Sequence, residues 1–158
     1  MAHDFPWGKL KAEDGPRGRP RRSNSVPRRR VRSFDVPTAF LRGFPLGRTV
    51  HVTIPGELQR LGGFKSKVVR LHRAAYGLAD APKAFFLKFK DSLTRLGFQQ
   101  VPGEAALFVL PRKNGAGCEA VIAVHVDDAF FACSEATYPV LQGLCEEYGI
   151  TSPIPLMR

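Results

Sequence analysis

Cysteine is scarce in this sequence. The 158 residues include three, at positions 118, 133 and 145, and no two of them are spaced as C-x-x-C. This set argues against a disulfide framework and against a structural zinc site. Long apolar runs are also missing, because no stretch reaches the roughly 18–20 residues needed to cross a bilayer. The first six residues lack the apolar core of a secretory signal. We therefore expect an intracellular protein, cytoplasmic or nuclear, with no membrane partner.

Acidic residues are few relative to basic ones, with 14 Asp and Glu against 24 Lys and Arg and a formal net charge of +10. Residues 1–33 hold ten of the basic residues and three acidic ones, and they are rich in Pro, Gly and Ser. Such a stretch buries too little apolar surface to offset its ordering entropy, which predicts a disordered arm. The arm either contacts nucleic-acid phosphates, through Arg28, Arg29, Arg30 and Arg32, or is a solvated tail.

The rest of the chain has enough apolar residues for one core, since hydrophobic residues make up 44 % of the sequence. Asp80-Ala81-Pro82 is a helix-start signal, five apolar side chains follow on one helical face, and Gly97 offers a C-cap. Residues 33–41 are expected to form a strand that runs into a turn and a short helix. Further strands are expected at residues 50–54, 68–71, 106–110, 120–126 and 129–133, and a second long helix at 134–148. This order predicts an α+β domain over residues 34–150, with an antiparallel sheet covered by helices on one face, and a tail at 151–158.

Asp127 and Asp128 interrupt two apolar strands, so they are expected at the tip of a hairpin. Two adjacent carboxylates repel each other, and a divalent cation relieves the repulsion. A third carboxylate on a neighbouring strand would complete a two-metal site for phosphoryl transfer. Asp35, at the end of a predicted strand, is the best candidate. The pair taken alone is also compatible with an ordinary solvated turn.

Four windows in order resemble the reverse transcriptase of copia-type LTR retrotransposons. Residues 34–43, F-D-V-P-T-A-F-L-R-G, are similar to the family motif D-V-x-T-A-F-L-x-G. Residues 75–86 resemble the block L-Y-G-L-K-Q-A-P-R-A-W-Y. The segments L-G-F and A-L-F, at 96–98 and 106–108, are similar to L-G-F…C-L-F, and residues 124–128, V-H-V-D-D, resemble the Y-V-D-D box.

The resemblance implies a polymerase palm-like domain that extends a primer 3′-end with deoxynucleoside triphosphates on an RNA or DNA template, within a Pol polyprotein. It implies Mg²⁺ (or Mn²⁺) as cofactor, held by Asp35, Asp127, Asp128 and the backbone carbonyl of Val36. The residues expected beside nucleotide and template are Phe40, Tyr76, Gly77, Ala81, Pro82 and His125, and Lys83 is expected to contact the nucleic-acid backbone.

Some positions depart from the family pattern. His125 replaces the usual Tyr, Asp80 replaces the usual Gln and would repel nearby phosphates, and Ala79 replaces a common Lys. The segment before Asp35 does not resemble the family's fingers, and no thumb is apparent, so we expect a palm-centred fragment. Two functions stay open: an active nucleotidyltransferase, or an inactive remnant that acts at most as a basic nucleic-acid-binding protein.

Overall fold

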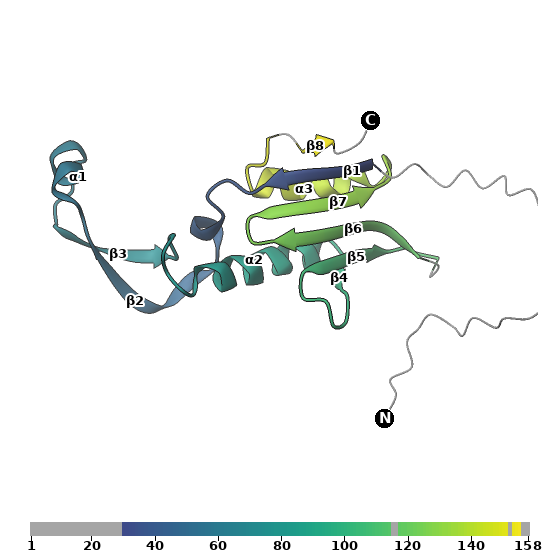
Figure 1. Ribbon diagram of the computed structural model, residues 1–158, viewed down its shortest axis with the longest axis horizontal. Helices are drawn as coiled ribbons and strands as arrows, with labels where there is room; N and C mark the ends of the chain where they lie inside the picture. The colour runs from purple at the N-terminus through teal and green to yellow at the C-terminus, as the bar shows by residue number, and fades with distance from the viewer. Residues whose placement is uncertain (1–29, 115–116, 152, 156–158) are drawn as a thin grey trace, which may run out of the picture.

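Six antiparallel strands form the main sheet of the computed structural model, which describes residues 30–114, 117–151 and 153–155 (Figure 1). The strand order across the sheet is β4-β5-β6-β7-β1-β8. The strands are β1 (Arg30–Asp35), β4 (Gln99–Gln100), β5 (Leu107–Pro111), β6 (Cys118–His125), β7 (Asp128–Cys133) and β8 (Ile154–Pro155). The predicted hairpin is confirmed: β6 and β7 pair along their length and turn at residues 126–127.

Two helices, α2 (Ala81–Arg95) and α3 (Tyr138–Glu147), cover one face of this sheet (Figure 1). Aromatic side chains fill the layer between them. The Phe89 ring lies 6.4 Å from the Phe34 ring of β1 and 5.1 Å from the Tyr148 ring at the end of α3. Burial alternates along β7, where Ala129, Phe131 and Cys133 are buried. The expected mixture of helices and an antiparallel sheet is therefore confirmed.

A smaller, two-stranded ribbon extends away from the main sheet (Figure 1). It pairs β2 (Pro45–Thr53) with β3 (Val68–Arg73), and the short helix α1 (Gly56–Leu61) lies between them. The 3-10 helix η1 (Ala39–Arg42) connects β1 to this ribbon. Both ribbon strands overlap the predicted ones and are longer, because pairing between them extends the regular structure.

Two predicted boundaries need correction. The arm was expected to reach residue 33, but Arg30 to Ser33 belong to β1, where they pair in register with Cys133 to Phe130 of β7. Residues 151–158 were expected to be a tail outside the domain, but Ile154 pairs with Ser33 and forms the outer strand β8. Both errors arise because the pairing partner lies far away in the sequence. Residues 1–29 lie outside the described part of the chain.

The second helix begins at Tyr138, later than residue 134, because a turn precedes it. In that turn the hydroxyl groups of Ser134 and Thr137 lie 2.9 Å apart. Within the described residues, no helix is long and apolar enough to cross a membrane.

Candidate active site

Asp127 lies in the two-residue turn of the β6–β7 hairpin, and Asp128 begins β7. The first turn residue, Val126, has a φ of 56°. This left-handed conformation disfavours a β-branched residue and costs about 1–2 kcal/mol. The strain persists because the pairing of His125 with Asp128 closes the turn on both sides. The acidic tip is thus held in one shape by its flanking strands.

Asp35, the last residue of β1, lies directly opposite Asp128 on β7. Side chains at directly opposite positions of antiparallel strands have Cβ atoms about 4.5–5.5 Å apart. The contact between the end of β1 and the hairpin extends one residue further, where the Val36 N–H donates a hydrogen bond to the Asp127 carbonyl over 2.8 Å. The fold therefore brings together the two carboxylates that the sequence separates most widely.

The face of the sheet on which Asp35 and Asp128 lie is the one without helices. Their neighbours Phe34 and Ala129 are buried against the helix layer, and side chains alternate along a strand. His125 is paired with Asp128 from the other side, so an imidazole and two carboxylates form one row across three strands. All three side chains are exposed.

The three aspartate side chains are not arranged as a complete metal-binding site. Across residues 30–114, 117–151 and 153–155, no group of three or more His, Cys, Asp or Glu side chains is gathered closely enough to hold a metal ion. Asp35 and Asp128 share a row, whereas Asp127 lies at the half-buried tip beside them. The donor types nevertheless suit a hard divalent cation, which prefers carboxylate and carbonyl oxygens.

Two aromatic residues predicted to lie beside nucleotide and template contact each other. The rings of Phe40, in η1, and Tyr76, in the loop before α2, lie 4.6 Å apart and tilted by 50°. Phe40 is half-buried, and Tyr76 is 60 % exposed. Gly77 follows with a φ of 92°, a conformation that glycine adopts without a steric cost. The pair therefore presents an exposed aromatic surface where η1 meets this loop.

Gly43 allows η1 to approach α2 closely. A Cβ added at this position would lie 2.9 Å from the Ala84 carbonyl carbon and from the Phe85 nitrogen. The following amide, of Phe44, donates to the Ala84 carbonyl over 3.3 Å. The final glycine of the first motif therefore has a structural reason, which is backbone contact between the Asp35 segment and α2.

Asp80 does not cap α2 with its side chain but forms an ion pair with Arg48 of β2. Arg48 Nε donates to Asp80 Oδ2 over 2.9 Å, and Nη2 donates to Oδ1 over 3.2 Å. This hydrogen-bonded pair lowers the pKa of Asp80. Asp80 therefore has a cationic partner that the sequence analysis did not identify. Pro82 and Lys83 are exposed in the next helical turn, and Ala81 is fully buried.

The predicted arginines of the arm divide into two groups. Arg28 and Arg29 lie outside the described residues. Arg30 and Arg32 precede Asp35 on β1 by five and three residues, which is about 17 Å and about 10 Å along the strand. Arg30 Nε contacts Glu135 Oε1 at 2.9 Å, and the Arg32 guanidinium lies 4.1 Å from the centre of the Tyr138 ring. Both therefore have partners within the protein, and β1 does not bring them to the acidic tip.

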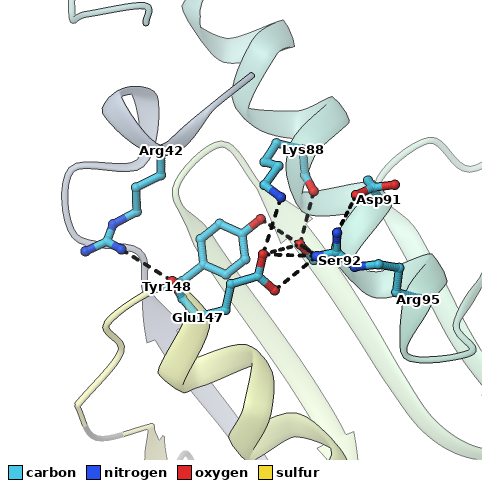
Figure 2. A network of polar contacts seen from close by, with 7 residues as sticks. All are labelled: Arg42, Lys88, Asp91, Ser92, Arg95, Glu147 and Tyr148. Atoms are coloured by element: carbon cyan, nitrogen blue, oxygen red, sulfur yellow. Dashed lines mark hydrogen bonds and ion pairs between the residues drawn. The ribbon is translucent and has the colours of Figure 1, made fainter. Parts of the chain in front are cut away.

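A polar network behind the sheet joins α2 to the end of α3 (Figure 2). Ser92 Oγ donates to Glu147 Oε1 over 2.9 Å and lies 3.0 Å from the Tyr148 hydroxyl. Arg95 and Lys88 contact the same carboxylate at 3.1 and 3.5 Å. Glu147 follows Lys88 by 59 positions and Arg95 by 52, so no local sequence pattern could reveal these contacts.

The charge of Glu147 is stabilised within this network. Burial by itself raises the pKa of Glu147, but the hydrogen bond from Ser92 and the charges of Arg95 and Lys88 outweigh it, so the pKa lies below its usual value. Burial is also the main cause of the raised pKa of Tyr148.

Comparison with known proteins gives a family match over most of the chain. A family model described as reverse transcriptase (RNA-dependent DNA polymerase) matches residues 24–148. The chain is 29 % identical over 122 residues to the retrovirus-related Pol polyprotein from transposon RE1 of Arabidopsis thaliana, which covers 76 % of this chain and 8 % of that protein. It is 34 % identical over 103 residues to the corresponding polyprotein from transposon RE2, covering 62 % and 6 %. The chain thus spans less than a tenth of these relatives. No solved structure matches it significantly.

Proposed function

Because the chain belongs to the reverse transcriptase (RNA-dependent DNA polymerase) family, we propose that it transfers nucleotides to a primer 3′-end on an RNA or DNA template. One observation carries this proposal: Asp35 lies opposite Asp128, on the sheet face that the helices leave open. An open antiparallel sheet with acidic residues at one end and helices behind it is the arrangement expected of a polymerase palm. The rest of a Pol polyprotein would be its covalent partner.

Asp35, Asp127, Asp128 and the Val36 carbonyl would hold Mg²⁺ or Mn²⁺. The Asp35 and Asp128 carboxylates already lie in one row, and the Asp127 carboxylate at the tip would turn toward them. When bound, the ions lower the pKa of the primer 3′-hydroxyl and neutralise the charge on the leaving pyrophosphate. In the reaction the 3′-oxygen loses its proton and bonds to the α-phosphorus of the nucleotide, and the bond from that phosphorus to pyrophosphate breaks.

Other residues of the chain would orient the substrates. The Phe40–Tyr76 pair offers a ring surface for a sugar or base. Lys83, exposed in the first turn of α2, would contact a backbone phosphate of the nucleic acid through its ammonium group. His125 lies next to Asp128 and would contact the primer end from β6. Positioning of this kind supplies much of the rate enhancement in phosphoryl transfer.

Primer extension by the purified full chain, on an RNA template with Mg²⁺, tests the proposal. We expect extension by the parent protein and its loss in Asp35→Asn and Asp128→Asn. Glu104→Gln, which changes an exposed carboxylate in the loop before β5, should retain activity. Absence of extension by the parent, where a control polymerase succeeds, would refute catalysis by this chain and leave its family membership intact.

Binding of nucleic acid without catalysis is the second candidate, and charge distribution supports it. The ribbon segment, residues 45–73, contains six Lys and Arg and one acidic residue. Such a surface binds phosphates with an affinity that falls steeply with salt, because each neutralised phosphate releases counterions.

Salt-dependent binding of a labelled duplex separates the two candidates. Asp128→Asn should abolish extension but preserve binding. Removal of residues 1–29, which leaves β1 whole, should weaken binding and reduce the slope of log affinity against log salt. If both affinity and slope are unchanged, the basic arm has no part in nucleic-acid binding.

A further inference from the structure

Arg42, the last residue of η1, joins segments that are far apart in the sequence (Figure 2). Its Nε donates a hydrogen bond to the Pro37 carbonyl over 2.9 Å, and its Nη1 lies 3.5 Å from the Glu147 carbonyl. Its guanidinium also packs against Gly149, where an added Cβ would lie 2.9 Å from Nη2. One side chain therefore connects the turn after Asp35 to the end of α3.

The two carbonyl groups that Arg42 contacts, those of Pro37 and Glu147, suit an arginine side chain. The guanidinium carries several N–H donors in a rigid plane, so it can reach two carbonyls that face different directions. The carbonyls at the C-terminus of a helix lack partners within the helix and carry the negative end of its dipole. Gly149, with a φ of 63°, turns the chain away from α3 and leaves room for the guanidinium.

The end of α3 is a firm anchor for this contact. The side chain of Glu147, whose carbonyl faces Arg42, is fixed to α2 by Ser92, Arg95 and Lys88 (Figure 2). Arg42 thus links the turn after Asp35 to a network that belongs to the helix layer.

We propose that Arg42 is a positioning residue: it holds the turn at residues 36–38 in the conformation that keeps Asp35 opposite Asp128. It acts through the Pro37 carbonyl and touches no substrate. The conformation of this turn can be monitored at the Val36 N–H. This N–H donates a hydrogen bond to the Asp127 carbonyl over 2.8 Å, beside the carboxylates of Asp35 and Asp128. If Arg42 holds the turn, this hydrogen bond opens more often when the guanidinium is removed. The claim that Arg42 supports metal binding rests on the proposed function. The claim that Arg42 fixes the conformation of the turn does not depend on it.

Amide hydrogen exchange of the full chain, followed by NMR, tests the role of Arg42 without any metal. In Arg42→Ala, exchange at Val36 should accelerate at least tenfold, while exchange at Ile122, in the core of β6, stays at the parent rate. Arg42→Lys should restore part of the protection, because an ammonium can reach only one of the two carbonyls. Arg60→Ala, which removes an exposed arginine from α1, should change neither amide. Unchanged exchange at Val36, or equal acceleration at Val36 and Ile122, overturns the proposal.

A pair of glycines supplies a second, matched test. Gly149 and Gly63 have almost the same positive φ, 63° and 61°, so replacement by alanine costs similar backbone strain at both. Only at Gly149 would the new Cβ displace Arg42, since nothing lies within 4 Å of the Cβ at Gly63. Gly149→Ala should therefore accelerate Val36 exchange as Arg42→Ala does, and Gly63→Ala should not. Equal behaviour of the two glycine variants contradicts the proposal.

Titration with Mn²⁺, monitored by electron paramagnetic resonance, connects the turn to the metal site. We expect Arg42→Ala to weaken Mn²⁺ binding about tenfold, which corresponds to about 1.4 kcal/mol. If the parent binds Mn²⁺ and Arg42→Ala binds it equally well, the positioning role is refuted while the proposed function stands. If the parent binds no Mn²⁺, the proposed function fails, and the exchange rate at Val36 alone decides for or against Arg42.

Discussion

Asp35 and Asp128 lie directly opposite each other on neighbouring antiparallel strands, although 93 positions separate them in the sequence. Like charges at such positions destabilise a sheet. A protein selected for stability alone would place a cation or a neutral residue at one of them. The arrangement is understandable if the two carboxylates share a divalent cation, and this interpretation makes stability depend on metal in a defined way.

Removal of one carboxylate should have opposite effects with and without metal. In the presence of a chelator, we expect Asp128→Asn to be more stable than the parent by roughly 0.2–1 kcal/mol, the range for cross-strand charge pairs. With excess Mn²⁺ the order should reverse, because only the parent gains free energy from the bound ion. Urea unfolding with and without MnCl₂ measures both differences, with Glu104→Gln as the control. Equal stabilisation of parent and Asp128→Asn by Mn²⁺ would contradict the shared site.

Relief of strain at the hairpin tip should stabilise the fold. Val126 is 45 % exposed and has a positive φ, so Val126→Asn loses little packing and gains a residue that tolerates this conformation. We expect an increase of about 1 kcal/mol in the free energy of unfolding. Val52→Asn is the matched control, because Val52 is 39 % exposed but lies in the extended strand β2, where Asn is disfavoured. A loss of stability in both variants would argue against strain at Val126.

Replacement of Gly43 by a larger residue should destabilise the fold much more than replacement of Gly47, because only Gly43 lies against the backbone of α2. The Cβ of Gly43→Ala would press on the backbone of α2 at 2.9 Å, whereas nothing lies within 4 Å of a Cβ at Gly47. We expect Gly43→Ala to cost roughly 1–3 kcal/mol, the usual range for an overpacked site, and Gly47→Ala to cost much less. Thermal and urea unfolding of the two variants provide the comparison, and similar losses in both would refute the contact.

The network around Glu147 should make stability fall in acid. The pKa of Glu147 is lowered in the folded protein, so its stabilising contribution is present above the ordinary carboxyl pKa and is lost as pH falls through the folded value. Glu147→Gln should flatten the stability profile below about pH 4.5, whereas Glu57→Gln, at an exposed position in α1, should leave its shape unchanged. Urea unfolding between pH 3 and 7 measures the profiles. Parallel profiles for Glu147→Gln and the parent would contradict this reading of the network.

Local sequence signals predicted much of the fold and the family. The hairpin at Asp127 and Asp128 follows from two apolar strands around a polar break, and α2 follows from a helix-start signal, a regular apolar face and a glycine at its end. The predicted membership in the copia-type reverse transcriptases is confirmed by the family match and the transposon relatives. The metal-ligand and substrate-contact roles of individual residues stay predictions.

Contacts between distant segments were beyond the reach of these signals. Arg30 and Arg32 continue the basic segment that precedes them in the sequence, but pairing with β7 makes them part of strand β1. Asp80 differs from the family pattern, but its partner Arg48 lies on the ribbon, 32 positions earlier. Arg42 is an unremarkable polar residue in the sequence, and its two carbonyl partners become visible only when η1 and α3 are placed together.

The position of β1 in the sheet has a consequence for how fast the protein folds. The β6–β7 hairpin can close within microseconds, because its two strands are joined by two residues. β1 must instead find β7 across a loop of more than ninety residues, a non-local step that slows folding. We therefore expect refolding experiments to show the acidic tip forming early and Asp35 arriving late. During synthesis, Asp35 would have to wait until the ribosome has made nearly the whole of the described chain.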